Sequence, residues 1–373
     1  MAPMRPHLAI VGLIGLCAAA AACGSSTRRA PVTARPSATR SAPVLTCGAP
    51  PDSRPRLSRV ASRTLALPGS PDGIATARGG QTSFVALQSG PARVAVVARQ
   101  RVGTVALPGY PSGMRVAPDG RTALAAVGDG AVVLDAHRVL GMLSTPSRVA
   151  GSGPGAAEIA VSPDSRYAFI TLEGAGRVAV FALRADRFVG SVPVGAGALG
   201  ITTSPDGRWL YEVSEAGGPH GAGRLNVIDL IRAEQHPSTA RVSQATVACA
   251  PVRVAVSPDG RTVWVTARDA NSLLGFSAAG LRRDPGRALT SVTRVGARPL
   301  GLAVVAGQRV LVADSGDRCV SVVDAAISPP SDRGCIASGA LPDAISAPPG
   351  AARALVTVSD SRELQVIALG GLP

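Results

Sequence analysis

A short pattern of small and apolar residues recurs along most of the chain. Each copy begins with Pro or a small residue, reaches an aliphatic anchor, and then alternates apolar and small side chains up to a turn. The anchors are Ile74, Met114, Ile159, Ile201, Val254, Leu302 and Ile345. They stand 40, 45, 42, 53, 48 and 43 residues apart. A period in the forties built from short strands predicts a β-propeller with one four-stranded blade per repeat.

The fifth repeat displays all the parts of a blade. It predicts an inner strand over 252–257, a second strand over 262–267 (TVWVTA), a third over 273–277 and an outer strand over 289–295. The second strand alternates with period two, as a half-buried strand does. The tripeptide Pro258-Asp259-Gly260 separates the first two strands, where Pro presets φ, Asp bonds its own backbone and Gly accepts positive φ.

The string SPDG therefore predicts a hairpin turn in most places, and not a catalytic site. Turns of this kind are expected at 118–120, 163–165, 205–207 and 258–260. The first SPDG, Ser70–Gly73, is different because it aligns with the residues just before an inner strand. The expected turn of blade one is Arg78-Gly79-Gly80 instead.

The two ends of the repeat array predict how the ring closes. The last repeat stops at its third strand, 364–369, and lacks an outer strand. A spare strand, 59–67 (RVASRTLAL), precedes the first repeat. We expect the two to pair, because closure protects sheet edges that would otherwise template aggregation. The predicted fold is an all-β, seven-bladed β-propeller of four-stranded antiparallel blades.

The charge of the chain is concentrated at its beginning. All 38 basic residues are Arg, and the formal net charge is +14. The first 63 residues hold nine Arg and one acid, so they carry +8 of that charge. Aromatic residues make up only 3% of the chain, whereas nucleic-acid grooves interleave Arg with aromatic side chains. A basic tail favours a tether near anionic lipid head groups over nucleic-acid binding.

The first residues predict export. Arg5 precedes an apolar run over 8–22 that is short for a membrane span and suits a signal peptide. The run ends in Ala20-Ala21-Ala22-Cys23, which resembles the lipobox of bacterial lipoproteins, in which a Cys is cut and lipidated. Cleavage by an ordinary signal peptidase is the alternative, since Ala20-x-Ala22 suits it too. We expect a protein anchored to the outer face of the cell membrane through lipidated Cys23.

The predicted domain organisation follows from these patterns. Residues 1–22 form a lipoprotein signal peptide, 23–56 a disordered basic linker rich in Pro, Ser and Thr, and 57–373 the propeller. We expect the protein to be a monomer.

Four cysteines remain after Cys17 and Cys23, and an exported chain with an even number favours disulfides. Cys319 lies on the predicted third strand of blade six and Cys335 on its fourth, so we expect them to pair. Cys47–Cys249 follows by elimination, and either pair could instead be free and buried. No metal site is predicted, because CxxC is absent and the remaining histidines stand at unrelated repeat positions.

The sequence contains no recognisable catalytic motif. GxSxG, HExxH and a P-loop are absent, and no cofactor is predicted. If a ligand binds, propeller geometry favours the loops around one mouth of the central channel. The candidates on that face are Arg115, Glu173, Glu215, His220, Asp269, Asn271, Asp314, Asp317, Asp360 and Arg362. For each residue alone, a solvated loop position is the simpler interpretation.

The repeats resemble those of the YVTN/YncE-like seven-bladed propellers of bacterial envelopes. The resemblance is carried by strings such as IAVSPDSRYAFITLEGAGRVAVFAL (159–183) and VAVSPDGRTVWVTARDANSLLGF (254–276). It covers residues 57–373 and implies the fold rather than an activity. Related propellers include lactonases and quinoprotein-like domains, whose catalytic residues have no counterpart here.

Three functions are compatible with these patterns. The first is an exported, lipid-anchored scaffold that binds an envelope protein or a small ligand, without enzymatic activity. The second is a lactonase-like enzyme or a propeller that depends on a metal or a quinone. The third is nucleic-acid binding. We favour the scaffold, because no catalytic constellation is visible.

Overall fold

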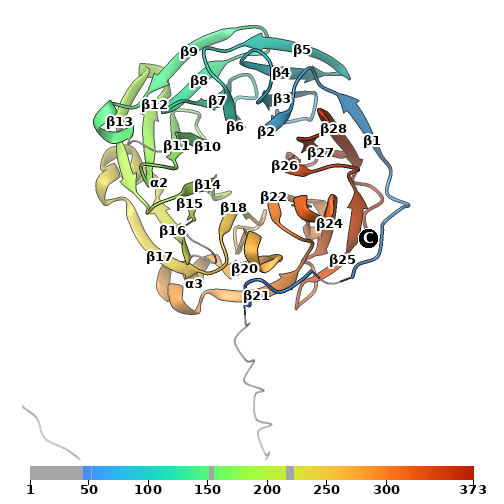
Figure 1. Ribbon diagram of the computed structural model, residues 1–373. Coiled ribbons are helices and arrows are strands. Elements are labelled where there is room, and N and C mark those ends of the chain that lie inside the picture. Colours follow the sequence, from blue (N-terminus) through green and yellow to red (C-terminus); the bar gives the residue numbers. More distant parts are fainter. Residues whose placement is uncertain (1–44, 52, 151–154, 216–221) are drawn as a thin grey trace, which may run out of the picture. The chain divides into compact units, whose positions relative to one another are not determined.

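The computed structural model describes residues 45–51, 53–150, 155–215 and 222–373. Its strands form seven four-stranded antiparallel sheets arranged as blades around a central channel, which confirms the predicted fold (Figure 1). None of the helices in these residues is long and apolar enough to cross a membrane.

The strands follow one another from the channel outward in each blade. Blade one is β2 (Pro71–Thr76), β3 (Thr82–Leu87), β4 (Arg93–Ala98) and β5 (Arg101–Ala106); blade two is β6 (Pro111–Val116), β7 (Ala123–Val127), β8 (Gly130–Leu134) and β9 (Val139–Ser144); blade three is β10 (Ala156–Val161), β11 (Tyr167–Leu172), β12 (Arg177–Ala182) and β13 (Arg187–Pro193). Blade four is β14 (Ala198–Thr203), β15 (Trp209–Ser214), β16 (Gly223–Asp229) and β17 (Arg241–Val247); blade five is β18 (Pro251–Val256), β19 (Thr262–Ala267), β20 (Ser272–Ser277) and β21 (Leu289–Arg294). Blade six is β22 (Pro299–Val305), β23 (Arg309–Asp314), β24 (Cys319–Asp324) and β25 (Ser331–Ala337); blade seven is β26 (Pro342–Ser346), β27 (Arg353–Val358), β28 (Glu363–Ala368) and β1 (Ser62–Ala66).

Short helices connect some of the strands. They are α1 (Ser147–Ala150), α2 (Leu230–Gln235) and α3 (Ala278–Arg283), with 3₁₀ turns η1 (Leu183–Ala185), η2 (Pro237–Thr239), η3 (Arg268–Ala270), η4 (Pro285–Arg287), η5 (Ala306–Gln308) and η6 (Ser315–Asp317). We call the side of the ring that carries α2, α3 and the PDG turns the turn face. The opposite side, which carries the loops between second and third strands, is the mouth face.

The PDG tripeptides form the predicted turns. In blade five the Gly260 N–H donates to the carbonyl of Ser257 at 2.8 Å, and Asp259 accepts from the Arg261 N–H at 3.0 Å. Gly260 has a φ of 70°, a backbone conformation that favours glycine. The first SPDG instead enters the inner strand β2, as its register predicted.

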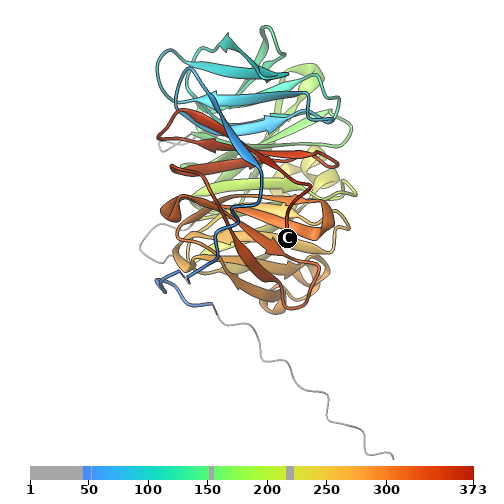
Figure 2. The same ribbon diagram turned by 90° about the vertical axis from the view of Figure 1, so that its right-hand side faces the viewer.

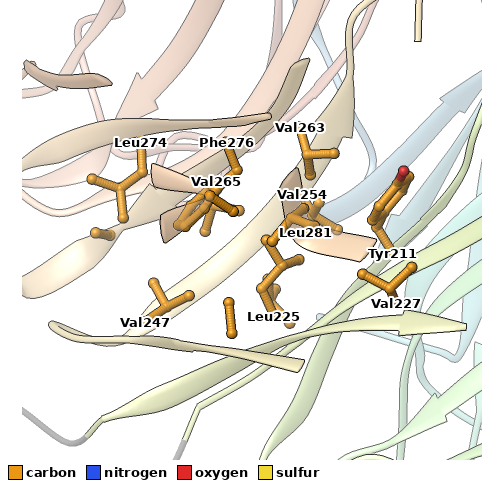
Figure 3. Packing of buried hydrophobic residues seen from close by; sticks show 14 of the residues in the cluster. Tyr211, Leu225, Val227, Val247, Val254, Val263, Val265, Leu274, Phe276 and Leu281 are labelled. Carbon is orange, nitrogen blue, oxygen red and sulfur yellow. The ribbon is translucent and has the colours of Figure 1, made fainter. Parts of the chain in front are cut away.

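The blades bury their apolar faces against one another. The packing between blades four and five is typical: Leu225 and Val227 of one sheet contact Val263 and Val265 of the next, and Leu281 of α3 completes the cluster (Figure 3). Each blade therefore depends on both neighbours for its core.

The ring closes as the sequence predicted. β1 pairs antiparallel with β28 from Ser62 opposite Ile367 to Ala66 opposite Glu363, so the first strand of the chain is the outer strand of the last blade. In Figure 1 the blue strand β1 lies beside the red strand β28.

The chain before β1 is more ordered than the expected linker. Residues 45–51 and 53–61, which we call the strap, cross the rim of blades five and six before reaching β1 (Figure 2). The Gly48 N–H donates to the carbonyl of Asp269 at 2.7 Å, and the Leu57 N–H donates to that of Cys335 at 2.8 Å. A disulfide joins Cys47 to Cys249, with Cα atoms 5.3 Å apart. The propeller unit thus begins before the predicted boundary at residue 57.

The second expected disulfide is not formed, and Cys319 and Cys335 are free, buried thiols. Cys319 lies opposite Ala337, and Cys335 lies opposite Ser321, so the two are diagonal neighbours. Residues directly opposite one another have the short Cβ separation that a disulfide requires. The hydrogen bond between the two thiols and their burial raise the pKa of Cys319, and the same bond lowers the pKa of Cys335.

Arg54 fastens the strap to blade six. Its guanidinium lies 3.1 Å from a carboxylate oxygen of Asp314, 2.7 Å from one of Asp317 and 3.4 Å from one of Asp332. The side chain of Asp314 is fully buried, and that of Arg54 is 8% exposed. Burial raises the pKa of Asp314 to about 7, although Arg54 and Ser321 oppose the rise.

We predict that Arg54→Met lowers the free energy of unfolding by about 3 kcal/mol, because it leaves buried carboxylates without their cation. The loss should be larger at pH 8 than at pH 5, since Asp314 can take up a proton at the lower pH. Denaturant unfolding at both pH values measures it. The matched control is Arg56→Met on the exposed part of the same strap, which should change stability by less than about 0.5 kcal/mol. Equal effects of the two variants would contradict the role of Arg54.

Candidate functional site at the channel mouth

The inner strands approach one another closely around the channel. The third residue of the inner strand is Gly73, Gly113, Gly200, Gly301 or Ala344 in five blades. A Cβ on Gly200 would come within 2.8 Å of the Cα of Arg253, and one on Gly73 would collide with the Ser112 carbonyl. Small residues at this position are thus required by the crowding of neighbouring backbones.

Blades three and five depart from this rule with Glu158 and Arg253. Glu158 Oε1 and Arg253 Nε lie 3.1 Å apart, although the two residues come from β10 and β18. Their side chains are 17% and 23% exposed, so the ion pair is partly buried but still reached by solvent. Both line a cavity of about 110 Å³ in the channel, together with Arg115 of β6.

Further carboxylates surround Arg253. Asp72 of β2 and Asp343 of β26 hydrogen-bond to each other, and Glu173 follows β11 on the mouth face. Burial opposes the charge of Arg253, but the carboxylates of Glu158, Asp343, Asp72 and Glu173 outweigh it and raise its pKa. We call Asp72, Glu158, Glu173, Arg253 and Asp343 the mouth cluster.

The neighbouring arginines do not balance all the carboxyl groups of the mouth cluster. Burial, with the neighbouring Asp72 carboxylate, raises the pKa of Asp343. Burial and the charge of Glu215 likewise raise the pKa of Glu173. Four acids face two arginines, because Arg115, whose Nε donates to the Ile159 carbonyl at 3.0 Å, also lines the cavity. Burial lowers the pKa of Arg115, but an arginine keeps its charge at neutral pH. The mouth of the channel is therefore acidic in a chain whose net charge is +14.

Several predicted site residues lie near this cluster. Arg115 lines the cavity, and Glu173 stands beside Arg253. Glu215 forms a bidentate ion pair with Arg268. The Nε atom of Arg268 also lies 3.2 Å from a carboxylate oxygen of Asp269. These residues extend the charged surface outward from the mouth.

Other candidates are occupied by structural contacts. Asp314 is wrong as a ligand residue, because it is fully buried and held by Arg54. Asp317 binds the same arginine, and Asn271 donates to the strap carbonyl of Ala49 at 2.8 Å. Asp360 accepts from the Leu341 N–H at 2.7 Å. Arg362 is exposed, and His220 lies outside the described residues.

The sequence interpretation missed Asp72, Glu158, Arg253 and Asp343. A signal for two of them was present, since Glu158 and Arg253 stand where other repeats have Gly or Ala. A further missed acid, Glu212, is fully buried in blade four, where it accepts hydrogen bonds from Ser214 and Asn226. Burial raises its pKa to about 8, but it lies within the sheet and not at the mouth cavity.

The residues that the structure describes offer no group of three or more His, Cys, Asp and Glu placed to hold a metal ion. Arg253 supplies the positive charge around which the carboxylates of the mouth cluster gather.

Comparison with known proteins supports the fold alone. No protein-family model matches the chain, and no curated protein sequence matches it. A chain in the structure of Kuenenia stuttgartiensis hydrazine synthase is similar, with a TM-score of 0.67 and 18% identity over 82% of this chain and 96% of that chain. A chain of the mitotic checkpoint complex is similar with a TM-score of 0.68 and 15% identity, over 89% of this chain and 99% of that chain.

The raised pKa of Asp343 predicts a pH-dependent stability. Between about pH 4, where a free Asp titrates, and the raised native pKa, the folded protein binds more protons than the unfolded chain. The free energy of unfolding should therefore fall as the pH rises through this window. Asp343→Asn should reduce that slope, to which other buried acids such as Asp314 still contribute, and should stabilise the protein at pH 7.5 by on the order of 1 kcal/mol. Urea unfolding at several pH values tests this, and parallel curves for the two proteins would refute it.

Proposed function

We propose that this protein is a lipid-anchored binding scaffold of the cell envelope, similar to YVTN/YncE-like propellers, whose channel mouth receives a cationic group of its ligand. The observation that carries the proposal is the excess of half-buried carboxylates around Arg253 in a strongly basic chain. Carboxylates with raised pKa values gain free energy when a cation approaches, because the cation favours their charged form.

The geometry restricts the ligand. The cavity of about 110 Å³ is too small for a drug-sized molecule, and its lining holds Arg115 and Arg253 with Glu158 as its one acid. A guanidinium or ammonium group of a partner protein would therefore bind beside the cavity, at the carboxylates of Asp72, Glu173 and Asp343. The surrounding residues Glu215, Arg268 and Asp269 supply a polar rim.

We predict that agmatine, which carries both cationic groups, binds the purified protein in isothermal titration calorimetry. Its affinity should rise between pH 5 and pH 8, because burial raises the pKa of Asp343 and a bound cation must displace the proton that this carboxyl group holds. Asp343→Asn should weaken binding at least tenfold. Asp129→Asn is the matched control, since Asp129 lies on the mouth face outside the cluster, and it should change affinity less than twofold. Binding that is insensitive to Asp343 would rule out the mouth as the site.

Membrane attachment is a separate part of the proposal. Cys23→Ala should shift the protein from the membrane fraction to the soluble fraction and abolish incorporation of an alkyne-labelled fatty acid. Cys17→Ala is the control and should leave labelling unchanged. Labelling that survives in Cys23→Ala would place the lipid elsewhere.

A hydrolase of the lactonase type is the second candidate, and the Asp72–Asp343 pair favours it. Two hydrogen-bonded carboxyl groups can supply an acid and a base. The small cavity favours the scaffold instead. If the protein hydrolyses a compound from a lactone panel and Asp343→Asn abolishes this activity, the protein is an enzyme and not only a scaffold.

A further inference from the structure

The connections between third and fourth strands differ among the blades on the turn face. In blade four this connection contains α2, whose Leu230 and Ala233 are buried and which packs against β12 and β13 of blade three. In blade five it contains α3, whose Ala278 and Leu281 are buried and which packs against β17 of blade four. Each helix thus packs between its own blade and the preceding one. Beside α3 a cavity of about 360 Å³ remains, lined by Arg282 and by turn residues of blades four and five.

Blade one has no such helix. Its β4 and β5 are joined by Arg99 and Gln100 alone, with φ values of 47° and 72° in a tight hairpin turn. The groove between blade one and the preceding blade, which is blade seven, contains a cavity of about 510 Å³. In Figure 1, β1 and β28 of blade seven lie next to blade one at the closure of the ring.

The cavity combines an apolar floor with a cationic rim. Its floor is formed by Leu65, Val97, Leu355, Leu364 and Val366, and Val97, Leu364 and Val366 are buried. Three arginines stand at its edge: Arg63 of β1, Arg99 of the hairpin and Arg353 of β27. The residues that line it include no Asp or Glu.

We propose that this groove binds an amphipathic anion, with an acyl chain on the apolar floor and a carboxylate or phosphate at the three arginines. Three cations without an acid in the lining favour an anionic head group. The volume lies within the usual range for ligand sites, which are mostly apolar with a few polar groups that fix orientation. In blades four and five, buried side chains of α2 and α3 pack into the equivalent grooves. The site lies on the turn face and is independent of the mouth cluster.

The test is calorimetric titration of the full-length protein with decanoate, kept below the concentration at which it forms micelles. Decanoate should bind saturably at one site, whereas decanol and decyltrimethylammonium should bind at least tenfold more weakly. Absence of saturable binding, or equal affinity for all three compounds, would overturn the proposal.

Two pairs of variants locate the site. Arg353→Ser should weaken decanoate binding at least fivefold, and its control Arg138→Ser, on blade two, should have no effect. Ala352→Trp should fill the groove and abolish binding; because Ala352 is exposed, the substitution should leave the fold intact. Its control is Ala185→Trp, at an exposed alanine in the connection between β12 and β13 of blade three. Decanoate affinity unchanged in both groove variants would overturn the assignment.

The anion could come from a membrane lipid or from a free fatty acid, and vesicles distinguish these sources. If the source is a membrane lipid, phosphatidylglycerol vesicles should retain the Cys23→Ala protein, which lacks the proposed lipid anchor, better than the same protein carrying Ala352→Trp, which has the same charge. If the two proteins sediment equally with these vesicles while decanoate still discriminates between them, the ligand is the free anion.

Discussion

The backbone pairing between β1 and β28 is the contact on which the rest of the propeller depends. Each blade obtains its core only by packing against its two neighbours, so an open ring would leave two apolar faces and an unpaired sheet edge. The pairing supplies the last blade with its fourth strand. It also brings the residues of the mouth cluster, which come from blades one, three, five and seven, into one place.

The strap reinforces this closure from outside. It is covalently joined to Cys249, ion-paired to blade six through Arg54, and continuous with β1. The segment therefore spans three consecutive blades next to the closing seam. Its acidic partners are positioned by blade six, and this explains why Asp314 and Asp317 are used inside the fold and not at a ligand site.

The two faces of the ring have different chemistry. The mouth face gathers carboxylates around Arg253, whereas the groove between blades seven and one gathers arginines around an apolar floor. The mouth cluster exists because two long charged residues replace small ones at the crowded axis. The groove lies beside the two-residue connection between β4 and β5 of blade one.

The sequence by itself determined the blades, the PDG turns and the closing strand, because each is encoded by contiguous residues whose period and turn chemistry are local. It also left two cysteines, Cys47 and Cys249, as a pair by elimination, and the structure joins them. Only the tertiary structure decided that Glu158 meets Arg253, that Asp72 meets Asp343, and that Cys319 and Cys335 stay as thiols. These contacts join side chains of different blades or depend on strand register, so they arise only when the ring is assembled. The same reason applies to the strap and to the open groove, since neither local propensity nor repeat spacing specifies which surfaces a segment covers.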